Sequence, residues 1–318
     1  MFLSIKVHMT KRREKTCIIC GSESGTLSYV RHLDCFFYRC LKCNHEVLSN
    51  TGDQEKEVYF DKVQELFYEE ETDWILAPFS RWIFAQVARE RMKLVKTLLS
   101  NGKILEVGPG SGEFLVAAAK ERFEVEAVEC SRKLCTHLRS ISSCKIYDGT
   151  LEEVDFGNSM FDAVLSFHVI EHVPDPKKHL ECTARIVNPG GYLILTTPNA
   201  RSWDHRMLKN RWTGYQVAHL NLFSRDSMEL CLKSAGWNVL EISTKESALD
   251  LLYTIKTALK PKEQNLSKRL GDPWVKSMPL NLGRAIFSCF AVLSLPFCSL
   301  KAKLGGGNEL LVIAEQRH

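Results

Sequence analysis

The chain has 318 residues, 45% of them hydrophobic and 25% charged, which is enough for one large domain with attachments. Its formal net charge of +4 is too small to argue for a nucleic-acid partner. The N-terminus carries scattered charges and lacks the apolar run of a signal peptide. We therefore expect a cytoplasmic protein whose 12 cysteines stay reduced.

The first 50 residues divide into two parts. Residues 1–16 are a basic arm, for which a solvated tail is a better interpretation than a binding element. Residues 17–50 hold two Cys-x-x-Cys pairs, the pattern of a zinc ribbon, each followed by a residue suited to a left-handed turn, Gly21 or Asn44. A closed four-thiolate site is structural, so we expect structural Zn2+, with redox-active dithiols as the alternative. The expected metal ligands are Cys17, Cys20, Cys40 and Cys43.

A glycine-rich motif follows a helical region. Residues 51–101 are expected to be a linker and N-terminal helices, because apolar residues recur at helical spacing between positions 82 and 99. Ile104–Gly112 (ILEVGPGSG) then has the pattern of a buried strand, a glycine-rich turn and a helix start, which lets the backbone approach a ligand closely. Its third glycine comes one residue too early for a dinucleotide site. The three glycines are Gly108, Gly110 and Gly112.

Strands and helices alternate beyond this motif, as they do in α/β proteins. Glu129 ends the next expected strand, where its two carboxylate oxygens could accept hydrogen bonds from both hydroxyls of a ribose. A helix is expected from Ser131 to Ser140. The expected strands after the motif are Val125–Glu129, Cys144–Tyr147, Phe161–Phe167, Gly191–Thr196, Asn238–Ser243 and Glu309–Glu315.

Four phrases in this order resemble class I S-adenosylmethionine (SAM)-dependent methyltransferases of the ubiquinone-biosynthesis-like, small-molecule group: ILEVGPGSG, FDAVLSFHVIEHVPDP, NPGGYLILTTPN and HLNLFSRDSMELCLKSAGW. The resemblance implies an α/β fold with a Rossmann-like, seven-stranded, mostly parallel sheet flanked by helices and a reversed last strand. The methyltransferase domain would comprise residues 102–248 and 306–318. Residues 249–305 would be a helical, partly apolar insertion before the last strand.

The same resemblance implies SAM as the cofactor. In such enzymes the acidic residue before the glycines helps to hold the methionine end of SAM, and adenine contacts follow the third strand. The cofactor-binding residues expected on this basis are Glu106, Gly108, Gly110, Gly112, Glu129, Thr150, Leu151 and Phe167.

Three histidines are candidate catalytic residues. Methyl transfer to a hydroxyl needs an aligned nucleophile and is helped by a general base, for which imidazole suits neutral pH. His168 and His172 follow the fourth strand, at the sheet edge where open α/β folds bind ligands, and His219 lies beyond the fifth strand. Some related enzymes hold a divalent ion with Glu-x-x-Glu-His and a distant histidine. Here Glu171, His172 and His219 match that pattern and His168 replaces the first carboxylate, so a divalent metal at Glu171, His172 and His219 is the alternative.

Residues 285–300 are sixteen uncharged residues between basic flanks. A spanning helix needs about 20 apolar residues, and Pro296 is expected to interrupt this segment, so we do not expect it to span a membrane. It could cover the active site as a lid. It could also lie at a membrane interface and bury a few large side chains: Phe287, Phe290, Leu293 and Phe297.

The sequence therefore predicts methyl transfer to a hydroxyl of a small-molecule, sugar or lipid-linked acceptor, in a cytoplasmic protein with peripheral membrane contact as an open alternative. A zinc-ribbon RNA methyltransferase is the second hypothesis, although the chain carries no strong nucleic-acid signal. A non-catalytic SAM-binding regulator is the third.

Overall fold

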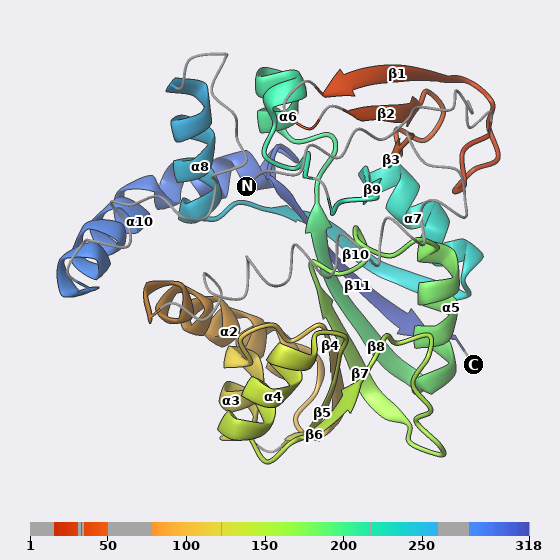
Figure 1. The fold of residues 1–318 in the computed structure, drawn as a ribbon, viewed down its shortest axis with the longest axis vertical. Coiled ribbons are helices and arrows are strands. Elements are labelled where there is room, and N and C mark those ends of the chain that lie inside the picture. The colour runs from red at the N-terminus through yellow and green to blue at the C-terminus, as the bar shows by residue number, and fades with distance from the viewer. Residues whose placement is uncertain are drawn as a thin grey trace, which may run out of the picture.

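A computed structural model describes residues 16–259, except positions 31, 32, 34, 50–77, 122 and 217, together with residues 280–317. The predicted basic arm, apart from its last residue, and the predicted linker before residue 78 therefore lie outside the described residues. Figure 1 shows how the helices and strands of these residues are arranged.

A seven-stranded sheet forms the centre of the molecule, in the order β10-β11-β8-β7-β4-β5-β6. Strands β4 to β8 run parallel to one another, and β11 is antiparallel to both of its neighbours, β8 and β10. This arrangement confirms the predicted Rossmann-like, mostly parallel sheet with a reversed last strand. The strands are β4 (Gly102–Val107), β5 (Phe123–Glu129), β6 (Lys145–Asp148), β7 (Phe161–Phe167), β8 (Val187–Pro198), β10 (Trp237–Lys245) and β11 (Glu309–Gln316).

Helices cover both faces of this sheet, because alternate residues of each buried strand point to opposite faces. In β4, for example, Ile104 packs with one group of helices and Leu105 with the other. Figure 1 shows α2, α3 and α4 on one side and α5 and α7 on the other. The helices are α2 (Pro78–Leu98), α3 (Glu113–Ala118), α4 (Arg132–Ile141), α5 (Pro176–Ile186) and α7 (Arg225–Ser234).

A second, four-stranded sheet has the order β1-β2-β3-β9, and Cys40 of the paired cysteines ends its strand β2. Its first three strands come from the N-terminal module, but β9 comes from the segment between β8 and α7. Phe37 of the module and Trp212 of that segment are both fully buried in the shared core. The N-terminal module is therefore built into the domain formed by the central sheet and its helices. The elements are β1 (Gly25–Val30), β2 (Cys35–Cys40), β3 (Glu46–Leu48), α6 (Trp203–Leu208), the 3-10 helix η1 (Lys209–Arg211) and β9 (Asn221–Leu222).

Two helices, α8 (Ala248–Leu259) and α10 (Leu280–Lys303), come from the segment between β10 and β11 and extend away from the central sheet (Figure 1). The prediction that Pro296 interrupts the apolar segment is wrong, because α10 continues through Pro296. The proline removes one backbone hydrogen bond, and the neighbouring turns on both sides continue the helix.

Candidate active site

The glycine-rich turn joins β4 to α3 at the carboxyl end of the parallel strands. Gly108, Gly110 and Gly112 have φ angles of 64°, 57° and 76°, which glycine adopts without strain. A Cβ atom at Gly108 would lie 2.8 Å from Val169 Cγ2, and one at Gly112 would lie 2.6 Å from Leu138 Cδ2. A Cβ atom at Gly110 would meet open space. Gly108 and Gly112 thus permit close packing within the protein, and the backbone at Gly110 is left accessible to a ligand.

Two buried carboxylates lie at the ends of the adjacent strands β4 and β5. Burial raises the pKa of Glu106 to about 8, and its Oε2 has no hydrogen-bond partner among the described residues. Burial also raises the pKa of Glu129, whose Oε1 accepts a hydrogen bond of 2.9 Å from the backbone N–H of Ser131. A buried carboxylate oxygen without a partner costs free energy, and a polar ligand group would satisfy it. The residues therefore fit the ammonium and hydroxyl groups of SAM.

The remaining predicted cofactor residues lie around these two carboxylates. Thr150 follows Gly149, whose N–H donates to the Glu129 backbone carbonyl. The Thr150 hydroxyl donates to Glu153 Oε2 at 2.9 Å. The Leu151 side chain is buried in the core beside α5, so its backbone is the part left for a ligand. The ring of Phe167 lies 3.8 Å below the guanidinium of Arg91 on α2.

His168 directly follows β7 and bridges two carboxylates. Its Nδ1 lies 3.2 Å from Glu171 Oε1 and its Nε2 lies 2.7 Å from Glu309 Oε1. Desolvation alone would lower the pKa of this histidine, but the charge of Glu309 and the hydrogen bond to Glu171 outweigh it and raise the pKa to about 10. An imidazolium cannot accept a proton near neutral pH, so the geometry argues against His168 as the general base.

Glu171, His172 and His219 form a compact cluster, with His172 half-buried and the other two buried, and their ligand atoms all lie within 4.8 Å of one another. The Nδ1 atoms of His172 and His219 lie 3.0 and 2.7 Å from the backbone carbonyls of Ala218 and Gly214. Donation from Nδ1–H to a carbonyl leaves Nε2 of each ring as a lone-pair donor, the tautomer found in metal-binding histidines.

Electrostatics keep both rings of this cluster neutral and its carboxylate charged. Burial lowers the pKa of His172, and burial together with His172 lowers the pKa of His219 to about 3. Burial would raise the pKa of Glu171, but the hydrogen bond and charge of His168 outweigh it and lower the pKa to about 2. One carboxylate and two neutral imidazoles are a donor set that suits a divalent transition metal. The cluster could also take a proton from an acceptor hydroxyl.

The four predicted zinc ligands also come together. Cys17 Sγ lies 3.6 Å from Cys43 Sγ, and Cys20 Sγ lies 3.6 Å from Cys40 Sγ. All four sulfur atoms are within 4.8 Å of one another. These separations are too long for disulfides and close to the roughly 3.8 Å between sulfurs bound tetrahedrally to zinc at about 2.3 Å.

The turns after the two cysteine pairs have the predicted shape. Gly21 and Asn44 have φ angles of 67° and 57°. The N–H of Gly21 donates to the Cys17 carbonyl at 2.8 Å, and the N–H of Asn44 donates to the Cys40 carbonyl at 3.0 Å. The prediction of left-handed residues at these two positions is therefore confirmed.

Hydrogen bonds connect the cysteine module to the histidine cluster. The hydroxyl of Ser224 donates to the Cys43 carbonyl at 2.7 Å. The side chain of His45 lies 3.2 Å from Asn221 Oδ1, and the N–H of Asn221 donates to the Glu171 carbonyl at 3.0 Å. Asn221 is in β9, two residues after His219. The module thus supports the chain segment that carries one of the candidate catalytic residues.

The sequence agrees with this geometry when it is compared with known proteins. A family model described as a methyltransferase domain matches residues 79–242, slightly more than half of the chain. This chain belongs to the methyltransferase-domain family. The matched residues include the glycine-rich turn, both carboxylates and the whole histidine cluster.

Two relatives are named as ubiquinone biosynthesis O-methyltransferases. The one from Pectobacterium atrosepticum is 29% identical over 109 residues, covering 32% of this chain and 45% of its own length. The one from Xanthomonas oryzae pv. oryzae is 27% identical over 149 residues, covering 42% of this chain and 62% of its own length. The match therefore spans less than two thirds of either relative. A solved structure from Thermotoga maritima, described as a SAM-dependent methyltransferase and possible histamine N-methyltransferase, is 23% identical with a TM-score of 0.44. It covers 59% of this chain and 84% of its own.

Three residues of this site were not predicted from the sequence. Thr197, at the end of β8, donates its hydroxyl to Glu171 Oε2 at 3.0 Å. Glu309 begins β11, and because that strand is reversed its first residue lies at the carboxyl edge of the parallel strands, opposite Pro198. The predicted direction of the last strand could therefore have indicated Glu309. Arg91, which covers Phe167, left no comparable signal, because a charged residue on a helix is usually solvated.

Proposed function

We propose that this protein is a SAM-dependent methyltransferase that acts on a hydroxyl group of a small molecule, a sugar or a lipid-linked compound. The pair of buried carboxylates, Glu106 and Glu129, around the three-glycine turn is the observation that carries the proposal. The cluster of Glu171, His172 and His219 supplies groups that can act on an acceptor. The two named relatives support oxygen as the acceptor atom, because both are O-methyltransferases by name.

The chain's own residues would hold and shield SAM. We assign the unpartnered Oε2 of Glu106 to the methionine ammonium group, and the Glu129 carboxylate to the ribose hydroxyls. The backbone beside Thr150 and Leu151, next to Glu129, is assigned to adenine. When bound, SAM supplies an electrophilic methyl group on a positively charged sulfur. The protein then has to align the acceptor with this methyl group and exclude water.

We infer that Glu171, His172 and His219 hold a divalent transition metal that would polarise the acceptor hydroxyl. Both imidazoles are held neutral with Nδ1 against a backbone carbonyl, as metal-binding histidines are. A pKa of about 3 makes His219 a weak base near neutral pH. If the site works without a metal, His172 is the residue left to take the proton.

We also propose that Cys17, Cys20, Cys40 and Cys43 bind structural Zn2+. Four close thiolates repel one another unless a cation lies between them. The metal would hold the two turns together, and with them β3 beside β9. Its role would be to support the segment that carries His219, with no direct part in the reaction.

Labelled SAM incubated with the protein and separate aqueous and lipid fractions of a cell extract would test this function. We expect one fraction to take up label. His219→Ala should keep its SAM affinity, measured by calorimetry, and lose transfer by at least about 100-fold, the scale of a lost acid–base or metal contribution. If a metal is required, a chelator should abolish transfer by the wild type and an added divalent metal should restore it. Transfer by His219→Ala at the wild-type rate would remove the cluster from the reaction.

A further inference from the structure

The outward face of α10 has the composition expected of an interior. Its exposed large side chains are Ile286, Val292, Leu293, Leu295, Phe297 and Leu300, with exposed fractions from 49% for Phe297 to 81% for Leu293. No charged residue occurs between Arg284 and Lys301. At about 100° per residue, the exposed positions between 285 and 300 cover about 200° of the helix circumference.

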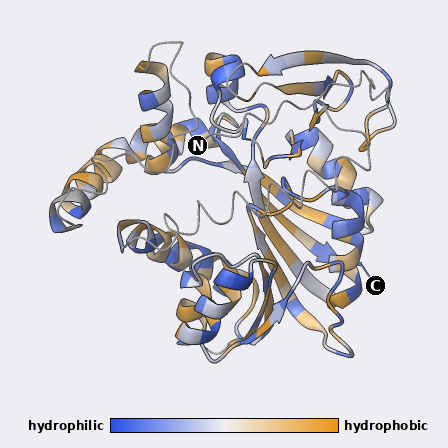
Figure 2. Ribbon diagram, in the orientation of Figure 1, coloured by the Kyte–Doolittle hydropathy of each residue, from blue (hydrophilic) through white to orange (hydrophobic). Residues whose placement is uncertain are grey.

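In the C-terminal half of the same helix, the inward face is more polar than the outward face. Ser294, Cys298 and Lys301 are buried there, one turn apart, although Lys301 carries a charge. A surface helix of a water-soluble domain shows the opposite pattern, with its apolar stripe turned inward. A contiguous exposed apolar surface that covers this much of a helix marks an interaction site. Figure 2 shows hydrophobic colouring along most of α10, as in the strands of the central sheet.

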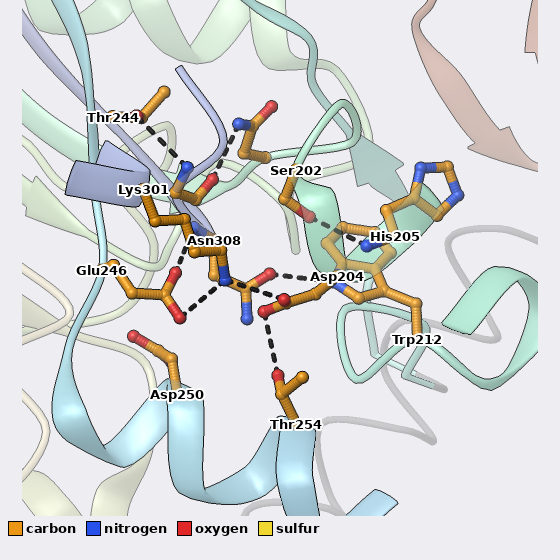
Figure 3. A network of polar contacts seen from close by, with 12 residues as sticks. Ser202, Asp204, His205, Trp212, Thr244, Glu246, Asp250, Thr254, Lys301 and Asn308 are labelled. Atoms are coloured by element: carbon orange, nitrogen blue, oxygen red, sulfur yellow. Dashed lines mark hydrogen bonds and ion pairs between the residues drawn. The ribbon is translucent and has the colours of Figure 1, made fainter. Parts of the chain in front are cut away.

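Lys301 attaches the C-terminal end of α10 to the domain. Its ammonium lies 2.7 Å from Asp204 Oδ1 and 2.8 Å from Glu246 Oε1, and Asp204 also accepts a hydrogen bond from Thr254 (Figure 3). The hydroxyl of Thr244 donates to the carbonyl of Ala302 at 2.7 Å. The outward direction of the apolar face is therefore fixed relative to the sheet.

The N-terminal half of α10 is attached as well. The ring of Phe287 packs edge-on against Phe79 and Trp82 of α2, with ring centroids 6.1 Å apart in both pairs. Phe290 is also half-buried. The prediction that Phe287 and Phe290 face a membrane is therefore wrong for Phe287, and Phe290 is a poor candidate. Leu293 and Phe297, the other two side chains considered for membrane burial, are exposed.

We propose that α10 docks in the plane of an anionic lipid bilayer, with its outward face in the acyl boundary and the basic residues at its ends against the headgroups. Arg284 and Lys303 flank the apolar segment, and α10 contains no acidic residue. This charge pattern complements an anionic surface. An arc of about 200° suits lipid, whereas a second protein helix would cover a narrower stripe.

The contacts of the inward face decide between docking and spanning. Among the described residues, Arg284–Lys303 is the one helix long and apolar enough to cross a membrane, and only 17% of that segment is buried. However, its inward face is bound to the protein at both ends, at Phe287 and at Lys301. A bilayer can therefore contact the outward face alone, which requires α10 to lie along the membrane surface.

Docking would bring the candidate active site close to the bilayer. Five residues separate Lys303 from Glu309, the partner of His168. The proposal about α10 does not depend on methyl transfer, because it concerns a surface and a lipid.

Flotation of the full chain with vesicles tests the proposal. Vesicles of phosphatidylcholine with phosphatidylglycerol should carry the wild type upward at low salt, and vesicles of phosphatidylcholine alone should carry less. Leu293→Asp should reduce the floated fraction by at least about tenfold, because it puts a charge in the acyl boundary. Leu230→Asp is the matched control, because Leu230 is 42% exposed on α7. This variant should float as the wild type does. Equal urea denaturation midpoints would show that both variants fold.

Four results would overturn it. The wild type could stay with the unbound protein on both vesicles. Leu293→Asp could float like Leu230→Asp. The wild type could also form a dimer in solution that Leu293→Asp dissociates while neither binds vesicles, which would assign the face to a second copy of the chain. Retention on the vesicles after carbonate extraction would argue against in-plane docking and for a spanning helix.

Discussion

Replacing Lys301 by methionine tests the buried network that fixes α10. Methionine keeps most of the apolar length of lysine, so the change removes the charge with little change in packing. Lys301 is 2% exposed and is the cation between Asp204 and Glu246. The variant therefore leaves two carboxylates buried and facing each other.

The size of the effect follows from what each carboxylate keeps. Asp204 retains the hydroxyl of Thr254 at 2.9 Å, and Glu246 Oε2 retains the N–H of Asn308 at 2.8 Å. Removing one partner of a buried ion pair costs about 3–5 kcal/mol. Because each carboxylate keeps one hydrogen bond, we expect the lower end, a loss of about 3 kcal/mol in the free energy of unfolding at pH 8.

The loss of stability in Lys301→Met should become smaller as the pH falls. Burial raises the pKa of Glu246 to about 7 even with Lys301 present, and removing the lysine should raise it further. A carboxyl with a raised pKa binds more protons in the folded state than in the unfolded state, so stability rises as the pH falls toward 4.5. The difference between Lys301→Met and the wild type should therefore be largest above pH 8 and smaller near pH 5.5.

Urea denaturation followed by circular dichroism at both pH values measures this difference. Lys303→Met is the matched control, because Lys303 is exposed two residues further along the same helix and should change stability by less than about 0.5 kcal/mol. If Lys301→Met were as stable as Lys303→Met at pH 8, or if its deficit grew as the pH fell, the reasoning about this network would be refuted.

Two further predictions concern the metal and histidine sites. Protein purified under reducing conditions without chelators should carry one zinc at the four cysteines; Cys40→Ser should lose that metal and Cys289→Ser, an exposed cysteine of α10, should keep it, as elemental analysis would show. Glu309→Gln should lower stability by no more than about 1 kcal/mol, because the His168 side chain is 37% exposed. The pKa of His168 is raised to about 10, so its contribution is complete below about pH 6.5 and is lost as the pH rises through 10. The Glu309→Gln effect, measured by urea denaturation, should therefore be clear at pH 6 and absent above pH 10; an equal effect at both would exclude the ion pair as its cause.

The sequence predicted the parts of the fold that depend on local pattern. A buried strand followed by closely spaced glycines is compatible with few other local structures. Short stretches of chain therefore sufficed to predict where β4 and β5 end, and with them the positions of Glu106 and Glu129. The cysteine pairs were equally clear, because two Cys-x-x-Cys pairs at this separation have the spacing typical of a four-thiolate zinc site.

Contacts between distant segments left no local signal. The pairing of β3 with β9 joins Glu46 to Leu222, and the bond between His168 and Glu309 joins residues 141 positions apart. In α10 the sequence showed a run of apolar residues, and a uniformly apolar helix does not indicate which side faces the protein. Ser294, Cys298 and Lys301, which recur at helical spacing, lie on its inward face.

Calorimetric titration of SAM into the wild type and into Glu129→Ala tests whether the strand ends form a cofactor site. The wild type should bind SAM, and Glu129→Ala should bind it at least about tenfold more weakly, because a hydrogen bond to a charged group contributes about 1.5–3 kcal/mol. Glu124→Ala is the control, since Glu124 is in the same strand with its side chain 69% exposed, and it should bind as the wild type does. An unchanged affinity in Glu129→Ala would remove this residue from the site, and a wild type that does not bind SAM would contradict the proposed function itself.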